Sequence, residues 1–454
     1  MNKFNFTINK GSSIREALRK IDKNKKGIIL VIDNDKLIGV ASDGDIRRFI
    51  LENSINNKID KVINKKFVFA NRNTSREDLL KKLDQRIKVI PILSSQGKIV
   101  DIVTNENLPL MQEKSVYFRS RSPVRVSFGG GGTDLTNFFE QYGGAVINAT
   151  LSLYSHASLQ IRKDKKVHIE SLDLNKSITL KNLNSSSNVA KDFNLVLSVL
   201  KMIKPDFGFN LYLYSDYPMN SGLGGSAVVV SSIIGCFNQT RLDQWTNKEI
   251  AELSFQAERI HSNISGGWQD QYSTVTGGIN FMEFRSKGNL IHPIKLKPNI
   301  VRELEESLIL CDTGMKHNSG DIHDDQSKNL SKENIINQVK KNKLLSYEMR
   351  EDLLQGNLLN FAHKMDKAWH LKRSFSERIT NKKLDSIYSL AKAAGAIGGK
   401  LLGAGGGGFF LFFVPPENKI KVMQALTKKK LLIQPFIFDH EGLSSWRVRG
   451  GSRR

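Results

Sequence analysis

Apolar and polar residues follow a regular order in the first quarter of the chain. Residues 13–22 carry Ile14, Leu18 and Ile21 at helical spacing, and Ser12 or Ser13 can cap the start of that helix. The continuous apolar run at residues 27–33 predicts a buried strand. Residues 36–41 predict a second strand after an Asn-Asp turn, and residues 44–51 predict another helix.

This order returns further along the chain. Residues 75–83 predict a helix, and residues 88–93 and 99–103 predict two strands joined by a Gln-Gly turn. A helix, two strands and a terminal helix, found twice, form an internal repeat. We therefore predict an α/β domain of two similar halves at residues 1–113, followed by a short linker over residues 109–119.

The rest of the chain contains three glycine-rich segments, at residues 122–134, 218–227 and 400–410. The second of them follows a predicted strand of alternating polar and apolar residues at 209–215 and precedes an apolar helix at 228–237. Glycine lets the backbone approach a ligand closely, and a helix N-terminus adds partial positive charge. No Gly-Lys-Ser/Thr follows, so this is not a Walker loop. The context predicts a different kind of phosphate-binding loop.

Length and composition narrow the class of protein. A chain of 454 residues predicts two or three domains. The longest apolar stretch, residues 228–237, has about half the length that a membrane-spanning helix needs. The N-terminus is polar, and Cys236 and Cys311 are far apart without metal-like spacing. We expect a globular cytoplasmic protein without membrane association, disulfide framework or zinc site.

The net charge of +23 has two interpretations. A basic surface is typical of nucleic-acid binding, but the lysines are spread along the whole chain and no aromatic-plus-basic RNA-binding motif accompanies them. Charge alone does not specify a nucleic-acid partner. An anionic substrate uses the same positive field, and a nucleic-acid-binding module stays an alternative supported by charge only.

The second glycine segment, PMNSGLGGSA, resembles the nucleotide-phosphate loop of the GHMP kinases, the family of galactokinase, homoserine kinase and mevalonate kinase. Gly225 stands where many members have serine, which leaves the backbone cradle intact. The resemblance implies that the loop binds the phosphates of ATP and that Ser226 helps to hold Mg²⁺. The implied phosphate-binding residues are Ser221, Gly222, Leu223, Gly224, Gly225, Ser226 and Ala227.

The other two glycine segments match the family in order and approximate spacing. The first, SPVRVSFGGGGTD at residues 122–134, implies that Arg125 lies near the transferred phosphate. The third, KLLGAGGGGFF at residues 400–410, resembles the loop that closes over the active site. The implied sugar-side residues are Gly131, Gly132, Thr133 and Asp134, and those of the closing loop are Gly403, Gly405, Gly406 and Gly407.

Phosphoryl transfer also needs Mg²⁺ and a group that orients or deprotonates the attacking hydroxyl. Glu258 and Asp270 lie between the second and third motifs, in QAERIHSNISGGWQDQY. By resemblance, Glu258 is the second Mg²⁺ ligand and Asp270 is the catalytic base. Trp268 replaces a residue that is small and aliphatic in the family.

Residues 119–446 resemble, within this family, the D-glycero-D-manno-heptose 7-phosphate kinases. Such enzymes phosphorylate the anomeric hydroxyl and give a heptose bisphosphate on the path to GDP-heptose. A phosphorylated substrate needs cations, and Lys372 and Arg373 or residues 313–319 could supply them. A kinase for an unphosphorylated sugar such as fucose and a catalytically inactive nucleotide-sensing relative stay open.

The N-terminal repeat resembles a CBS-domain pair, of the kind found ahead of bacterial sugar nucleotidyltransferases, through the stretch ASDGDIRR. The resemblance implies that Ser42 and Asp45 bind the ribose of an adenine nucleotide that regulates the enzyme. Alternatively, Asp43 and Asp45 only cap the following helix. The expected fold is therefore an α+β GHMP kinase of two lobes, the second ferredoxin-like, preceded by a tandem CBS α/β domain. A homodimer is compatible with this organisation.

Overall fold

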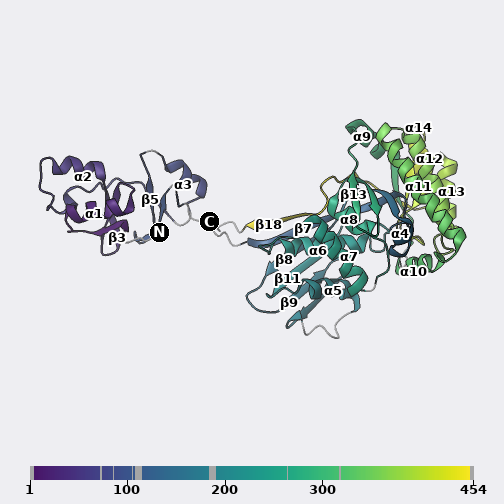
Figure 1. Cartoon of the computed structure of the whole chain (residues 1–454), viewed down its shortest axis with the longest axis horizontal. Coiled ribbons are helices and arrows are strands. Elements are labelled where there is room, and N and C mark those ends of the chain that lie inside the picture. Colours follow the sequence, from purple (N-terminus) through teal and green to yellow (C-terminus); the bar gives the residue numbers. More distant parts are fainter. Residues whose placement is uncertain are drawn as a thin grey trace. The chain divides into compact units, whose positions relative to one another are not determined.

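The computed structural model describes residues 5–71, 74–84, 86–104, 106–107, 115–183, 191–262, 264–315 and 319–449. They fall into two compact units, one within Met1–Lys114 and the other spanning Ser115–Arg449. Figure 1 shows the helices and strands of each unit. Each unit has its own hydrophobic core.

The first unit contains two three-stranded sheets with the same topology. In each sheet the first two strands are parallel and the last two are antiparallel. The two sheets confirm the internal repeat. The strands are β1 (Thr7–Asn9), β2 (Ile28–Asp33), β3 (Lys36–Ser42), β4 (Ala70–Asn71), β5 (Val89–Leu93) and β6 (Ile99–Thr104), and the helices are α1 (Ile14–Asn24), α2 (Asp43–Ile50) and α3 (Arg76–Lys82).

One detail of the repeat differs from expectation, and another cannot be compared with the structure. Each half opens with a short strand, β1 or β4, which the sequence did not predict because two or three residues show no periodicity. The terminal helix expected in the second half falls on a segment that lies mostly outside the described residues.

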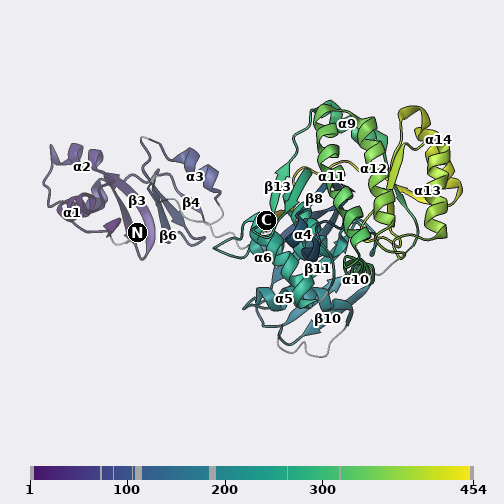
Figure 2. The ribbon, with the colours of Figure 1, turned by 45° about the vertical axis from the view of Figure 1, so that its right-hand side comes forward.

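The second unit begins with an eight-stranded sheet whose central strand is long and pairs with three others. Helices α5 to α8 belong to this part of the unit, and α6 packs against the two longest strands (Figures 1 and 2). The strands are β7 (Ser115–Gly129), β8 (Gly144–Ile161), β9 (Val167–Ser171), β10 (Lys176–Leu180), β11 (Phe209–Ser215), β12 (Ile279–Phe284), β13 (Leu290–Pro293) and β18 (Ser444–Arg449). The helices are α4 (Thr136–Tyr142), α5 (Asn194–Ile203), α6 (Gly225–Asn238), α7 (Asn247–Gln256) and α8 (Gln269–Thr276), with a π-helix at Ala257–His261.

A second sheet of four antiparallel strands completes this unit. Helices α11 and α12 lie side by side, with α12 against β15 of this sheet and α11 against β7 and β8 of the first sheet (Figure 2). Buried side chains of both sheets and of these two helices share one hydrophobic cluster, which joins the two lobes. The strands are β14 (Leu308–Asp312), β15 (Gly398–Leu401), β16 (Phe409–Phe413) and β17 (Leu432–Gln434), and the helices are α9 (Pro298–Ser307), α10 (Ser319–Asn329), α11 (Glu333–Gln355), α12 (Leu358–Arg373), α13 (Lys382–Ala394) and α14 (Pro416–Lys428).

One predicted boundary was wrong. Residues 115–119 were expected to be linker but begin β7, and residues 447–449 at the other end of the kinase unit belong to β18. The two segments pair with each other as antiparallel strands, so each satisfies the backbone groups of the other. Within the described ranges, no helix is long and apolar enough to cross a membrane.

Candidate active site

The glycine loop after β11 leads directly into α6, as the sequence predicted. Gly222 and Gly224 have φ of 74° and 79°, a conformation that glycine adopts without strain. Gly224 is the N-cap of α6, and among the described residues no side chain caps the first turn of that helix. The carbonyl of Leu223 accepts a hydrogen bond from the Arg125 backbone at 3.1 Å, which fixes the loop on β7. The loop therefore presents backbone N–H groups and a helix N-terminus to the adjoining space.

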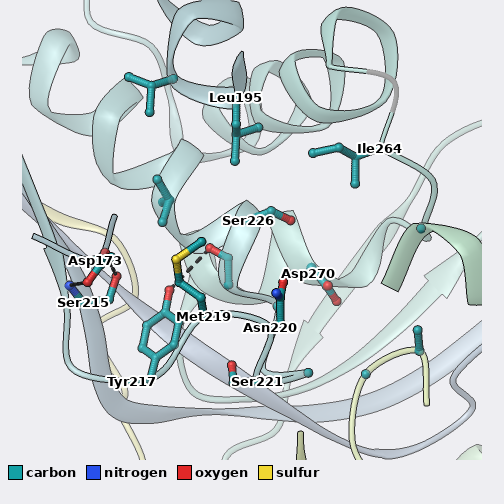
Figure 3. A pocket seen from close by; sticks show the side chains of 18 of the residues that line it. Asp173, Leu195, Ser215, Tyr217, Met219, Asn220, Ser221, Ser226, Ile264 and Asp270 are labelled. Carbon is teal, nitrogen blue, oxygen red and sulfur yellow. Dashed lines mark hydrogen bonds between the residues drawn. The ribbon is translucent and has the colours of Figure 1, made fainter. Parts of the chain in front are cut away.

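A cavity of about 360 Å³ opens over this loop (Figure 3). Its wall carries both apolar and polar side chains. The apolar lining residues include Leu174, Leu195, Leu213, Met219 and Val229, and the polar ones include Arg125, Ser226, Arg259, Asp270 and His323. Five of the seven predicted loop residues line the cavity. The other two, Leu223 and Ala227, have buried side chains.

Asp270 and Arg125 form an ion pair in the cavity wall. Arg125 Nε donates to Asp270 Oδ1 at 2.7 Å, and Arg125 Nη1 donates to the carbonyl of Gly222 at 2.9 Å. Burial opposes ionisation of Asp270, but the charge and hydrogen bond of Arg125 outweigh it and hold the pKa of Asp270 below its usual value. The structure thus joins two predicted residues that are 145 positions apart in sequence.

Glu258 and Ser226 also meet, although they come from different elements. Glu258 lies on the π-helix and is fully buried. It accepts hydrogen bonds from the Ser226 hydroxyl and, at 2.5 Å, from Gln271 Nε2. Burial raises the pKa of Glu258, although Arg259 at 3.9 Å and these hydrogen bonds act in the opposite direction. π-Helical turns are frequent at functional sites, and this one aims a carboxylate at the loop.

The first glycine segment, residues 122–134, contacts the start of α8 through Asp134. Asp134 accepts hydrogen bonds from the backbone N–H groups of Gly132 at 3.1 Å and Gln269 at 3.2 Å. Burial, reinforced by Asp270, raises the pKa of Asp134. Thr133 bonds both backbone groups of Ala145 through its hydroxyl. None of residues 131–134 is part of the cavity wall as described, and Asp134 instead ties the first glycine segment to the start of α8.

Lys372 and Arg373 are adjacent in sequence but lie in different surroundings. Lys372 is buried, donates to the carbonyl of Gly403 and lies close to Gly131. Burial lowers the pKa of Lys372 to about 8, against the opposing charge of Asp134. Arg373 pairs with Asp385 at 2.8 Å and lies over the ring of Trp369. The structure therefore brings Lys372 to the site, whereas Arg373 points to Asp385. The other candidate segment was 313–319, and its residues 316–318 lie outside the described residues.

The third glycine segment covers one side of the phosphate loop. Gly403 lines the cavity, and a Cβ there would lie 2.7 Å from Gly222, so the two glycine loops are in close backbone contact. Gly405 packs against Ile379, and the Gly406 N–H donates to the Ile379 carbonyl. Gly407 lies against the backbone of Met315. The loop is thus fixed on both sides.

Sequence reasoning missed three ionisable residues of this region. Arg259 donates to the carbonyls of Ile264 and Gly267, and Lys400 donates to the carbonyl of Ser127 from a fully buried position. His323 lines the cavity from α10. Arg259 and Lys400 adjoin recognised motifs, which could have drawn attention to them, whereas His323 has no such signal.

In the N-terminal unit, Ser42 and Asp45 contact each other. Ser42 Oγ accepts from the Asp45 N–H at 3.1 Å, and Asp45 Oδ2 accepts from the Ser42 N–H at 3.2 Å. The remaining Asp45 oxygen pairs with Arg48. Burial opposes ionisation of Asp45, but the Ser42 hydrogen bonds outweigh it and lower its pKa. The carboxylate caps α2, as the structural alternative expected.

Three known sequence families match this chain. The GHMP kinases N terminal domain matches residues 194–278, and the GHMP kinases C terminal domain matches residues 349–431. The CBS domain matches twice, at residues 1–52 and 59–108. These matches confirm the predicted fold class.

Individual relatives match about 70% of this chain. A D-glycero-alpha-D-manno-heptose 7-phosphate kinase of Campylobacter jejuni is 36% identical over 341 residues, which are 73% of this chain and 99% of the relative. The solved structure of a D-glycero-D-manno-heptose 1-phosphate kinase from Bacteroides thetaiotaomicron is 27% identical in sequence and superposes with a TM-score of 0.61. The match covers 73% of this chain and 100% of the chain in that structure. An L-fucokinase/L-fucose-1-P guanylyltransferase of Bacteroides fragilis is 24% identical over 68% of this chain and 36% of its own length.

Proposed function

The chain belongs to the GHMP kinase family and is a carbohydrate kinase; on that premise we propose that it phosphorylates the anomeric hydroxyl of D-glycero-D-manno-heptose 7-phosphate with ATP. Similarity to a heptose 7-phosphate kinase over 99% of that enzyme supports the choice of acceptor. The product is the 1,7-bisphosphate, an intermediate suited to nucleotide-heptose synthesis.

The observation that carries the proposed reaction is the Asp270–Arg125 pair beside the phosphate loop. A Cβ on Gly224 would lie 3.3 Å from Asp270 Oδ2, so the carboxylate adjoins the N-terminus of α6. A phosphate bound at that helix start and a hydroxyl bound at Asp270 would be neighbours. Such an arrangement supplies the positioning on which phosphoryl transfer depends.

The proposed step is a single displacement. The anomeric hydroxyl oxygen bonds to the γ-phosphorus of ATP while the bond from this phosphorus to the β–γ bridging oxygen breaks. ADP leaves with the electron pair of that bond, and the hydroxyl proton passes to the Asp270 carboxylate. Arg125 keeps Asp270 ionised and oriented, and its charge offsets the negative charge that develops in the transition state.

Ser226 and Glu258 are the proposed Mg²⁺ ligands. Mg²⁺ prefers hydroxyl, carboxylate and phosphate oxygens, and this pair of oxygen donors touches at the phosphate loop. Gln271 and the π-helix hold the Glu258 carboxylate in place before any ligand arrives. When bound, the ion would neutralise charge on the phosphate oxygens.

Lys372 is proposed to act at the reacting end of the sugar rather than at its distant phosphate. It lies between the first and third glycine segments, within reach of the charges of Asp134, Arg125 and Asp270. A single ammonium group suits the developing negative charge at this position. Arg373 is paired with Asp385 and is not proposed to contact the sugar.

The proposal is tested by kinase assays of the full chain with ATP and Mg²⁺. The acceptors are heptose 7-phosphate, heptose 1-phosphate, unphosphorylated heptose and fucose, and ³¹P NMR identifies the position of the new phosphate. We expect the highest kcat/KM with the 7-phosphate and a new signal from an anomeric phosphate. A higher kcat/KM for fucose or for unphosphorylated heptose would contradict the choice of acceptor.

We further propose that the CBS pair binds an adenine nucleotide and regulates the kinase. The duplicated sheets and the two CBS matches support this role. Calorimetric titration of the full chain with AMP, beside a variant whose active site is blocked by Ser226→Trp, would separate the two sites. Absence of any heat from the blocked variant would leave the pair as a structural element.

A further inference from the structure

His323 is a polar residue of the cavity wall to which the family motifs assign no role. It lies on α10, near the start of that helix, and faces the same cavity as Arg259, Asp270 and Gly403. The Nδ1 atom of His323 is buried and has no hydrogen-bond partner among the residues that the structure describes. A buried polar atom without a partner costs free energy, so its persistence in a cavity wall indicates a ligand that completes it.

The surroundings of His323 keep its ring neutral. Burial and the nearby charges of Lys372, Arg259 and Arg125 lower the pKa of His323 to about 3, against the opposing effect of Asp270. A neutral imidazole has one N–H donor and one acceptor nitrogen. It therefore differs from its cationic neighbours, which can only donate.

His323 lies near the charged groups of the cavity wall. The charges of Asp270, Arg259 and Arg125 all act on its ring, and the same cavity is also lined by apolar side chains such as Leu195 and Met219. Phosphate oxygens only accept hydrogen bonds at neutral pH, and the cations near His323 already provide donors for them. A sugar hydroxyl both donates and accepts, so it can complete Nδ1 in either tautomer of the neutral ring.

We propose that His323 is a specificity-determining residue that hydrogen-bonds a non-reacting hydroxyl of the acceptor sugar. This inference rests on the proposed function and adds to it a residue that selects the acceptor. A site built to bond a hydroxyl discriminates against analogues that lack it, because its own polar group is then left unpaired.

The first test replaces His323 by leucine and by asparagine. His323→Leu should raise the KM for heptose 7-phosphate about tenfold while the KM for ATP stays within twofold. His323→Asn keeps one donor and one acceptor and should restore most of the loss. His363→Leu, the same substitution at an exposed position of α12, serves as the matched control and should leave both values unchanged.

The second test removes hydroxyls from the substrate one at a time. With the wild-type enzyme, one monodeoxy acceptor should lose about tenfold in kcat/KM, and with His323→Leu that same analogue should lose nothing further. An unchanged acceptor KM in both variants, or equal losses by every analogue in wild type and variant, would overturn the assignment of His323 alone. A wild-type enzyme that phosphorylates no sugar would overturn the proposed function with it.

Discussion

Helices α2 and α6 satisfy their first turns in opposite ways. At α2, Ser42 and Asp45 form a reciprocal capping box, so the side chains of the helix itself occupy its first N–H groups. At α6, the N-cap is Gly224, and no described side chain caps the first turn. The sequence has a glycine-rich stretch before α6 and a Ser-Asp stretch before α2, and the structure shows that the Ser-Asp stretch caps its own helix.

This difference indicates what each helix start can do. A self-capped start is complete without a ligand, whereas an open start of a 14-residue helix offers N–H donors and partial positive charge to an anion. Substitutions around α6 should therefore change catalysis with little effect on stability. Substitutions at the start of α2 should change stability with little effect on catalysis.

The largest effect is expected from Asp270→Asn, which faces the open start of α6. The amide cannot accept the hydroxyl proton as a carboxylate does, so kcat should fall about 10³-fold. ATP affinity, measured by equilibrium titration, should change only a fewfold. A variant with near wild-type turnover would show that Asp270 is not the base.

The next effect is expected from Gly224→Ala. The new Cβ would lie 3.3 Å from Asp270 Oδ2 on a backbone with φ of 79°, so the cradle must distort. We expect the KM for ATP to rise about tenfold or more, because charge-assisted hydrogen bonds to the phosphates weaken. Gly288→Ala also substitutes a glycine of positive φ, but it has no atom within 4 Å of the new Cβ. It should leave the KM for ATP unchanged, and an equal rise in both variants would refute the phosphate-loop assignment.

Lys372 and Arg373 also differ in their surroundings, although they are neighbours in sequence: Lys372 contacts Gly403 at the site, and Arg373 pairs with Asp385. Lys372→Met should lower kcat/KM for the acceptor at least tenfold, whereas Arg373→Met should change it less than twofold. A similar loss from both substitutions would favour the original expectation that both residues hold the substrate.

The pH profile offers a second measurement on Lys372. Its pKa lies at about 8, so the ammonium is present below that pH and is lost as the pH rises through it. The value of kcat/KM, which reports the free enzyme, should therefore fall above about pH 8. Lys372→Arg should keep its charge and move this limb to higher pH. The charged or titratable groups around Lys372 are Asp134, Arg125, Asp270, His323 and Lys400.

The smallest effect is expected at the self-capped helix. Ser42→Ala should destabilise the N-terminal unit by about 1 kcal/mol, the usual cost of losing an N-cap, and leave basal kinase activity unchanged. Scanning calorimetry gives the stability. Ser75→Ala removes the N-cap of α3 in the other half of the repeat and should cost a similar amount. Loss of AMP binding in Ser42→Ala, without loss of stability, would instead indicate a ligand site.

The sequence by itself determined the repeat, the glycine loop between β11 and α6, and the family to which the kinase unit belongs. These features depend on neighbours in sequence: periodicity sets a helix or strand, and glycine positions set the loop conformation. For this reason the predicted helices and strands agree with the structure to within a few residues, and the strand 209–215 coincides with β11.

Tertiary structure alone decided which residues meet. Adjacent positions on α12 point to different surroundings, so Lys372 reaches the site while Arg373 pairs with Asp385. His323 enters the cavity wall from α10, and β18 pairs with the beginning of the kinase unit, more than 300 positions away. The spacing of residues along the sequence does not predict these contacts, because they depend on how separate helices and strands pack around a shared core.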